Sequence, residues 1–111
     1  MECPQIIYRE HALKRMFERN ITVEEVEDIL ANGEVIRTYP DDKPFVSYLL
    51  LGYINNRPIH IVASKDDEIC YVITVYEPDP AIWNEDFKTK RPWPVSFVKL
   101  AKRNPAKPPS F

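Results

Sequence analysis

Apolar and polar residues alternate with two different periods along this chain, and the period changes at Glu34. Before Glu34, apolar residues recur every three to four positions, which is typical of helices. After it they recur every second position, which is typical of strands. The segment ahead of the helical pattern, Gln5–Arg9, is short and β-prone, and predicts either a first edge strand or an extended lead-in.

The first helix is predicted at about Glu10–Arg19, ending near Asn20, a residue type that tolerates the left-handed conformation. At about 100° per residue, this helix is expected to bury one apolar side, made by Leu13, Met16 and Phe17. Nearly opposite lies a polar side that carries one imidazole and two guanidiniums, from His11, Arg15 and Arg19. Such groups bind phosphate and move protons, but on the pattern alone a solvated helix face is the simpler interpretation.

The second helix has the clearest boundaries in the sequence. Thr22 and Glu25 have the spacing of a capping box, and Gly33 is expected to end the helix. Its apolar stripe is formed by Val23, Val26, Ile29 and Leu30. Four acidic residues crowd its positive N-terminal end, where the helix dipole is a sufficient reason for them.

The strand pattern predicts an antiparallel meander, because the segments are joined by short turns. The expected strands are Glu34–Tyr39, Val46–Ile54, Arg57–Lys65 and Glu68–Tyr76, with tight turns at Asn55-Asn56 and Asp66-Asp67. The predicted fold class is therefore α+β, with two N-terminal helices packed on a four-stranded antiparallel sheet.

Two-residue turns also fix the register, and with it the two faces of the sheet. They place Leu51 opposite His60, and His60 opposite Ile73. The helices are expected on the face whose central side chains are smaller and more apolar. That face is made by Tyr48, Leu50, Gly52, Ile59, Ile61, Ala63, Cys70, Val72, Thr74 and Tyr76. His60 would then lie on the more open face, between Tyr53 and Tyr71. This register places His60 and Tyr76 on opposite faces unless a β-bulge intervenes.

Charge divides the chain into an acidic body and a basic end. Residues 1–86 hold 8 Lys and Arg against 17 Asp and Glu, whereas residues 87–111 hold 7 basic residues and no acid. We expect a domain over 1–87, closed by a short helical turn at Ala81–Phe87 with Trp83 as its anchor. Residues 88–111 are expected to form a basic, Pro-rich tail that either wraps the domain or is partly disordered. Such asymmetry suggests an acidic partner for the tail, or docking of the tail on its own body.

Composition narrows the class of protein. Nothing in the chain approaches the 18 consecutive apolar residues of a membrane span, and no secretory signal is seen at the N-terminus, which favours a cytoplasmic protein. In that compartment Cys3 and Cys70 are expected to be free thiols. The two histidines and two cysteines lack metal-ligand spacing, so neither a metal nor a cofactor is expected.

A series of motifs resembles the bacterial domain family called DUF4258. The resemblance runs in order from about Gln5 to Phe87 and leaves out the basic tail. Its motifs are His11-Ala12-x-x-Arg15-Met16-x-Glu18-Arg19-x-Ile21, Gly33-Glu34-Val35-Ile36, Tyr39-Pro40-Asp41-Asp42, Leu50-Leu51-Gly52, Arg57-Pro58-Ile59-His60-Ile61-Val62 and Thr74-Val75-Tyr76-Glu77-Pro78-Asp79-Pro80-x-x-Trp83.

The resemblance implies both a fold and an activity. DUF4258 proteins look like relatives of the RelE/MqsR-type toxins, which are small domains with N-terminal helices against an antiparallel sheet. Members are often encoded beside a zinc-ribbon, helix-turn-helix antitoxin of the YgiT/MqsA type. The resemblance therefore implies a toxin of a type II toxin–antitoxin pair, a metal-independent endoribonuclease that cuts mRNA and is bound by a cognate antitoxin.

Cleavage of RNA without a metal requires a base for the 2′-OH, a cation for the phosphorane oxygens and an acid for the 5′-oxygen. The chain has only two histidines, so His11 and His60 are the predicted acid and base, assisted by Tyr76. The predicted phosphate- and RNA-binding residues are Arg15, Arg19, Lys14 and Tyr53.

Two other functions remain open. The first is a non-catalytic protein-interaction module of toxin-like fold, since an acidic body suits contact with a basic protein at least as well as contact with RNA. The second is a nucleic-acid binder that works through its tail, with Lys88, Lys90, Arg91, Lys99, Lys102 and Arg103 on phosphates and Trp93 stacking on bases.

Overall fold

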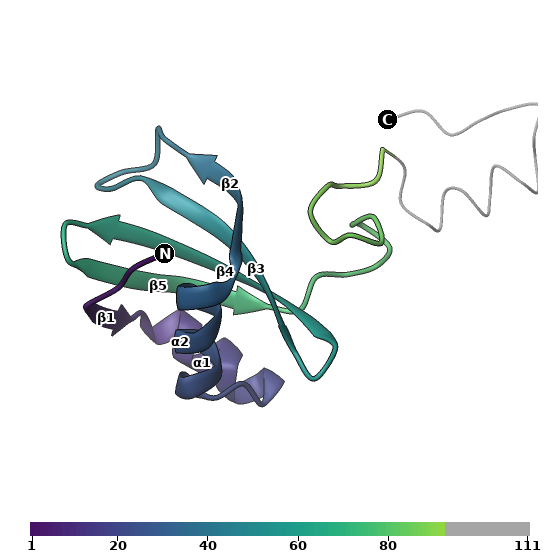
Figure 1. Ribbon diagram of the computed structural model, residues 1–111, viewed down its shortest axis with the longest axis horizontal. Helices are drawn as coiled ribbons and strands as arrows, with labels where there is room; N and C mark the ends of the chain where they lie inside the picture. Colours follow the sequence, from purple (N-terminus) through teal and green to yellow (C-terminus); the bar gives the residue numbers. More distant parts are fainter. Residues whose placement is uncertain (93–111) are drawn as a thin grey trace, which may run out of the picture. The chain divides into compact units, whose positions relative to one another are not determined.

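The computed structural model describes residues 1–92 as two units, Met1–Glu77 and the part of Pro78–Phe111 that ends at Pro92. The α+β class is confirmed (Figure 1). The elements are β1 (Gln5–Tyr8), α1 (Glu10–Arg19), α2 (Val23–Asn32), β2 (Glu34–Tyr39), β3 (Ser47–Ile54), β4 (Arg57–Asp66) and β5 (Ile69–Tyr76). Most of the predicted tail, including Trp93, Lys99, Lys102 and Arg103, lies outside the described residues.

The sheet has five strands in the order β1-β5-β4-β3-β2 and is mixed, so the predicted four-stranded antiparallel sheet was wrong in strand number and direction. The added strand is β1, the first of the two alternatives for the N-terminal segment. It pairs with β5 in parallel, with Ile6 beside Cys70. This strand has four residues and pairs with β5, which comes last in the sequence. Its own residues therefore do not predict the pairing.

A disulfide joins Cys3 to Cys70, so the expectation of two free thiols was wrong. The cause is the parallel pairing of β1 with β5. It brings the start of the chain beside residue 70, and the two Cα atoms lie 5.5 Å apart. Because the residues are 67 positions apart in sequence, their spacing alone did not reveal the pair.

Both helices begin and end close to their predicted residues. Asn20 ends α1 with a φ of 56°, and the capping box of Thr22 and Glu25 is formed at the start of α2. Gly33 ends α2 in an extended conformation, with its N–H bonded to the carbonyl of Ile29. Glycine is required there by close approach, since a Cβ would lie 2.5 Å from the Ile29 carbonyl oxygen.

The buried side of α1 differs from the prediction. Ala12 and Met16 are buried, whereas Leu13 is 46% exposed and Phe17 is 89% exposed. The connection from β1 sets this rotation, because the N–H of Arg9 still bonds to the carbonyl of Val72 before the helix begins. The helix therefore turns Ala12 and Met16 toward the core and leaves Leu13 and Phe17 as an apolar ridge on its outer side.

The core lies between the helices and one face of the sheet, the face that the predicted register assigned to them (Figure 1). Helix α2 supplies Val26, Ile29 and Leu30. The strands supply Leu50, Ile59, Ile61, Ala63, Val72 and Val75. Gly52 lies directly beneath Ile29, since a Cβ on this glycine would be 2.5 Å from Cγ1 of the isoleucine.

The predicted register is confirmed for β3 and β4, where Leu51 lies opposite His60. It was wrong for β5, because His60 lies opposite Tyr76 and not Ile73. The turn is one residue later than predicted, at Asp67-Glu68, and Ile73 is an extra, unpaired residue in a β-bulge. The bulge reverses the faces of all later residues in the strand, so Tyr76 joins His60 on the same face.

The described part of the second unit consists of turns. Ala81–Phe87 was predicted as a short helical turn, but the segment holds no helix. Residues 80–82 form one turn, closed by the N–H of Trp83 on the carbonyl of Asp79, and residues 85–86 form a second, closed by the N–H of Phe87 on the carbonyl of Asn84. Trp83 is buried, and the Lys90 ammonium lies 5.7 Å from the center of its indole ring.

Candidate functional site

The chemistry-bearing side chains of the first unit gather on the sheet face opposite the helical core, which we call the far face. By register, this face is formed by Ser47, Leu49, Leu51 and Tyr53 of β3, by His60, Val62 and Ser64 of β4, and by Tyr71, Thr74 and Tyr76 of β5. Two clusters lie on it, one around His60 and one around His11.

The first cluster is a hydrogen-bonded pair. Nδ1 of His60 lies 3.1 Å from the hydroxyl oxygen of Tyr76, and the two rings meet edge to face with their centers 5.2 Å apart. His60 is completely buried, whereas Tyr76 is partly exposed. Burial raises the pKa of Tyr76; nearby Tyr39 raises it further, and the Arg37 guanidinium lowers it. The pair therefore holds a neutral hydroxyl beside an imidazole. Two residues of β2, Arg37 and Tyr39, lie close enough to affect that hydroxyl.

The second cluster surrounds a hollow of about 290 Å³, which we call the His11 hollow. It is lined by Arg9, His11, Lys43, Pro44, Phe45, Ser47, Ser64 and Ile73. Two cationic side chains, an imidazole and two serines thus line one space. The serines are a cross-strand pair of β3 and β4 and are 3% and 6% exposed, so they form its floor.

The residues of the His11 hollow come from four stretches of the chain: residues 9–11, residues 43–47, Ser64 of β4 and Ile73 of β5. Arg9 is held at the end of β1 by its N–H bond to Val72, and His11 follows in the first turn of α1. Lys43 and Phe45 come from the loop between β2 and β3. The hollow therefore exists only when β1, the loop and the central strands are all in place.

One wall of the hollow is formed by the aromatic ring of Phe45, which packs on Tyr71, a residue outside the lining. The rings of Phe45 and Tyr71 are stacked, with an angle of 9° between their planes and 5.8 Å between their centers. The guanidinium carbon of Arg9 lies 5.5 Å from the center of the Tyr71 ring, close enough for a cation–π contact. This arrangement places a positive charge beside a flat apolar surface.

The structure brings together some of the predicted site residues. His60 and Tyr76 are in contact, and His11 lies in a hollow on the same side of the sheet. On β4, however, Ser64 of the hollow is four residues from His60, or roughly 13 Å along an extended strand. The two histidines therefore belong to separate clusters on the far face and do not contact a common reacting atom.

The predicted phosphate-binding residues do not line the hollow. Arg15 lies 3.7 Å from Glu18 on the surface of α1, and Lys14 is exposed on the same helix. The carbonyl of Arg19 accepts a hydrogen bond from Arg57, whose Nε also bonds to Glu77 at 3.2 Å. Tyr53 is 53% exposed on the far face, next to the β3–β4 turn.

The residues that sequence reasoning missed are the other members of the His11 hollow. Arg9 and Lys43 are isolated cations in the sequence, and only the parallel pairing of β1 with β5 places Arg9 beside the central strands. A weak signal existed in Ser47 and Ser64. The predicted register already placed these two polar residues opposite each other in otherwise apolar strands.

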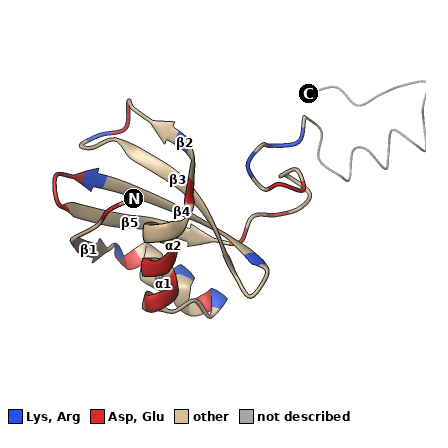
Figure 2. Ribbon diagram, in the orientation of Figure 1, with Lys and Arg blue, Asp and Glu red and all other residues tan. Residues whose placement is uncertain are grey.

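Helix α2 is the most acidic element of the first unit. Helix α2 carries Glu24, Glu25, Glu27 and Asp28 and no basic residue, as the red turns in Figure 2 show. This helix packs on the core face, so its acids lie across the sheet from the His11 hollow. Asp41 and Asp42 precede Lys43 in the loop but do not line the hollow.

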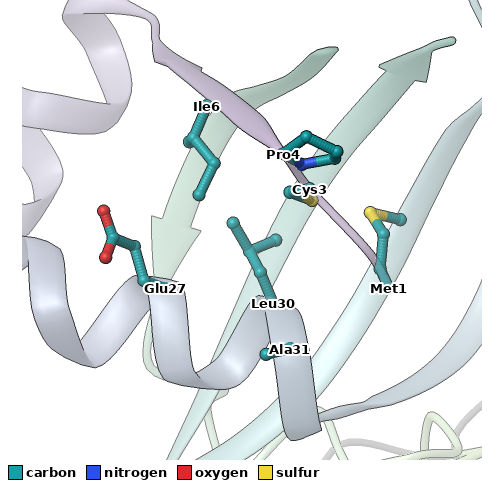
Figure 3. A pocket seen from close by; sticks show the side chains of 7 residues that line it. All are labelled: Met1, Cys3, Pro4, Ile6, Glu27, Leu30 and Ala31. Atoms are coloured by element: carbon teal, nitrogen blue, oxygen red, sulfur yellow. The ribbon is translucent and has the colours of Figure 1, made fainter. Parts of the chain in front are cut away.

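A second hollow, of about 330 Å³, lies between the N-terminal segment and α2 (Figure 3). It is lined by Met1, Cys3, Pro4, Ile6, Glu27, Leu30 and Ala31. Apart from Glu27 its side chains are apolar or belong to the disulfide.

Within residues 1–92, no three His, Cys, Asp or Glu side chains are grouped in a way that would hold a metal ion. In the same part of the chain, neither helix has the length and apolar character needed to cross a membrane.

Comparison with known proteins identifies one family. The family described as "Domain of unknown function (DUF4258)" matches residues 8–77, which include both clusters of the far face. No curated protein and no solved structure matches the chain.

Proposed function

The chain belongs to the DUF4258 domain family, and from that premise we propose that it is a metal-independent endoribonuclease acting on mRNA. We propose further that it is the toxin of a type II toxin–antitoxin pair and is neutralised by a cognate antitoxin. One observation carries the proposal: an imidazole and two cationic side chains line the same hollow on the far face.

The chemistry assigned to the hollow is transesterification of RNA. The imidazole of His11 takes the proton of the 2′-OH as the 2′-oxygen bonds to phosphorus. The bond from phosphorus to the 5′-oxygen then breaks, and the imidazolium returns its proton to that oxygen. A 2′,3′-cyclic phosphate and a 5′-hydroxyl remain. Arg9 and Lys43 stabilise the negative charge that develops on the phosphorane oxygens.

His60 and Tyr76 have a supporting role in this proposal. A completely buried imidazole does not meet RNA directly, but it fixes the direction of the Tyr76 hydroxyl. Tyr76 is then available to contact the nucleotide next to the one that reacts. The distance along β4 between the two clusters supports this division of roles.

The decisive substitution is His11→Ala. We expect it to reduce cleavage of a single-stranded RNA by at least about 100-fold, because general acid–base groups contribute about 10²–10⁴-fold. His11 is exposed in the first turn of α1, so its removal leaves the core unchanged. Induced expression in a bacterium, with primer-extension mapping of mRNA ends, gives the same test in cells. Growth arrest and new 5′ ends should both disappear.

The control is Lys65→Ala, which removes a cation that pairs across the strands with Cys70 and does not line the hollow. This variant should cleave at the wild-type rate. Wild-type cleavage by His11→Ala would overturn the assignment, and absence of cleavage by the folded wild-type protein would overturn the function.

A second function is favoured by the apolar ridge on α1. Leu13 and Phe17 are one helical turn apart and are 46% and 89% exposed, as expected for a protein-contact surface. In a non-catalytic interaction module, Phe17→Ser would relieve growth arrest and His11→Ala would not. The endoribonuclease proposal expects the opposite result for His11→Ala.

A further inference from the structure

We propose that the His11 hollow receives one unpaired nucleotide of single-stranded RNA, with its base against Phe45 and its phosphate between Arg9 and Lys43. This inference rests on the proposed function and adds the class of substrate that the site selects. The supporting observation is the aromatic ring of Phe45 in the wall of the hollow. The transesterification chemistry does not need this ring, so it has a separate role.

The size of the hollow supports a single nucleotide. Its volume of about 290 Å³ is close to the lower end of the range for ligand pockets, about 300–1,000 Å³. One nucleotide is a ligand of that scale, whereas a run of several stacked bases is larger. The buried serines at the floor add hydroxyls that hydrogen-bond to polar edges of a base or sugar.

The hollow offers separate partners for the base and for the phosphate of a nucleotide, because Phe45, Arg9 and Lys43 all line it. Phe45 is half-buried and braced by the stacked Tyr71 ring, so it offers a rigid apolar surface. Lys43 lies two residues earlier in the same loop, and Arg9 stands over Tyr71. A base that stacks on an aromatic side chain thus has two exposed cations beside it for its phosphate.

Single-stranded RNA is favoured over duplex RNA by the same geometry. In an A-form helix each base is stacked and paired, and proteins reach mainly the backbone and the 2′-hydroxyls. A base enters a lined hollow only when it is unpaired. The hollow should therefore bind single-stranded RNA more tightly than duplex RNA, and its affinity should depend on the presence of a base.

The test measures binding without cleavage, using fluorescently labelled 2′-O-methyl RNA, which lacks the 2′-OH nucleophile. Three probes are compared by anisotropy: a single strand, its duplex and the same strand with abasic sites. The wild-type protein should bind the single strand about 10-fold or more tightly than either of the others. Phe45→Leu should lose about 10-fold in affinity for the single strand and little for the abasic strand.

Matched variants separate the two parts of the site. Phe45→Tyr should restore the affinity for the single strand, and Lys43→Ala should weaken binding of single and abasic strands alike. Lys65→Ala should bind as the wild type does. Thermal melting of each variant shows whether it is folded.

Equal binding of duplex and single strand, or an equal loss in Phe45→Leu with and without bases, would overturn the inference. Because the probes are not cleavable, these results are independent of turnover. Stacking without cleavage of ordinary RNA would overturn the proposed function alone. Cleavage without stacking would overturn this inference alone.

Discussion

Tyr8 carries the one buried side-chain polar atom in the described residues that lacks a hydrogen-bond partner, its hydroxyl oxygen. The ring packs against the core from β1, while the oxygen lies near two acids of α2. An unsatisfied buried hydroxyl destabilises the folded state by about 1–3 kcal/mol. We therefore expect Tyr8→Phe, which keeps the ring, to raise the free energy of unfolding by about 1 kcal/mol. Urea unfolding of the two proteins measures the difference, and a less stable variant would contradict it.

The same residue predicts how stability depends on alkaline pH. Burial, followed by the charges of Glu27 and Glu24, raises the pKa of Tyr8 from 10.0 to about 12. Because the folded-state pKa is the higher one, the unfolded chain ionises first. This contribution to stability is complete below pH 10 and is lost as pH rises toward about 12. Melting temperatures across the alkaline range should fall less in Tyr8→Phe than in the wild type, and identical profiles would exclude the effect.

Single residues also show how far the site was predictable. His11 and His60 were predicted as candidate site residues because they are the two histidines of the chain, a fact that composition supplies. Arg9 and Lys43 could not be found in this way, because their proximity depends on a parallel strand pairing between distant segments. Leu13 and Phe17 were assigned to the wrong side of α1, since helical periodicity gives relative angles and not the rotation that the preceding strand imposes.

At the scale of elements, the packing of α2 on β3 depends on the missing side chain of Gly52. A Cβ at this position would lie 2.5 and 2.7 Å from two carbons of Ile29. We expect Gly52→Ala to reduce stability by about 1–3 kcal/mol through overpacking. The free energy of unfolding from denaturant titration tests this expectation.

The control for Gly52→Ala is the double variant Gly52→Ala/Ile29→Ala. Ile29→Ala alone should cost about 2–5 kcal/mol, because it leaves a cavity in the core. The methyl group added by Gly52→Ala then occupies part of that space, so the double variant should lose less stability than the two single losses added together. Strict additivity would show that the two residues do not press on each other.

The elements themselves were largely predictable, and their pairing was not. The capping box, the left-handed Asn20 and the Asn55-Asn56 turn are local chemistry, and each was predicted and is present. A β-bulge was left open as an alternative, but its position at Ile73 was not predicted, because an extra residue in a strand does not change the β-prone character of the sequence. The assignment of Tyr76 to a face depended on that one residue.

At the scale of the whole first unit, the disulfide closes a loop of 67 residues that contains almost all of the fold. A cross-link of this span stabilises the folded state by about 4 kcal/mol, because it lowers the conformational entropy of the unfolded chain. Cys3→Ala/Cys70→Ala should therefore unfold at a clearly lower urea concentration than the oxidised wild type. Reduced wild-type protein should match the double variant, and an unchanged midpoint on reduction would contradict the prediction.

The parallel pairing of β1 with β5 also has a consequence for the time at which the protein becomes complete during its synthesis. Every β1 residue pairs with a residue 64 positions later. At about 5–20 residues per second, its partner follows after roughly 3 to 13 seconds. Throughout that interval β1 has no strand to join, and Arg9 and His11 stand apart from the serines and the aromatic wall. A nascent chain therefore lacks the assembled hollow until nearly all of the first unit has been translated.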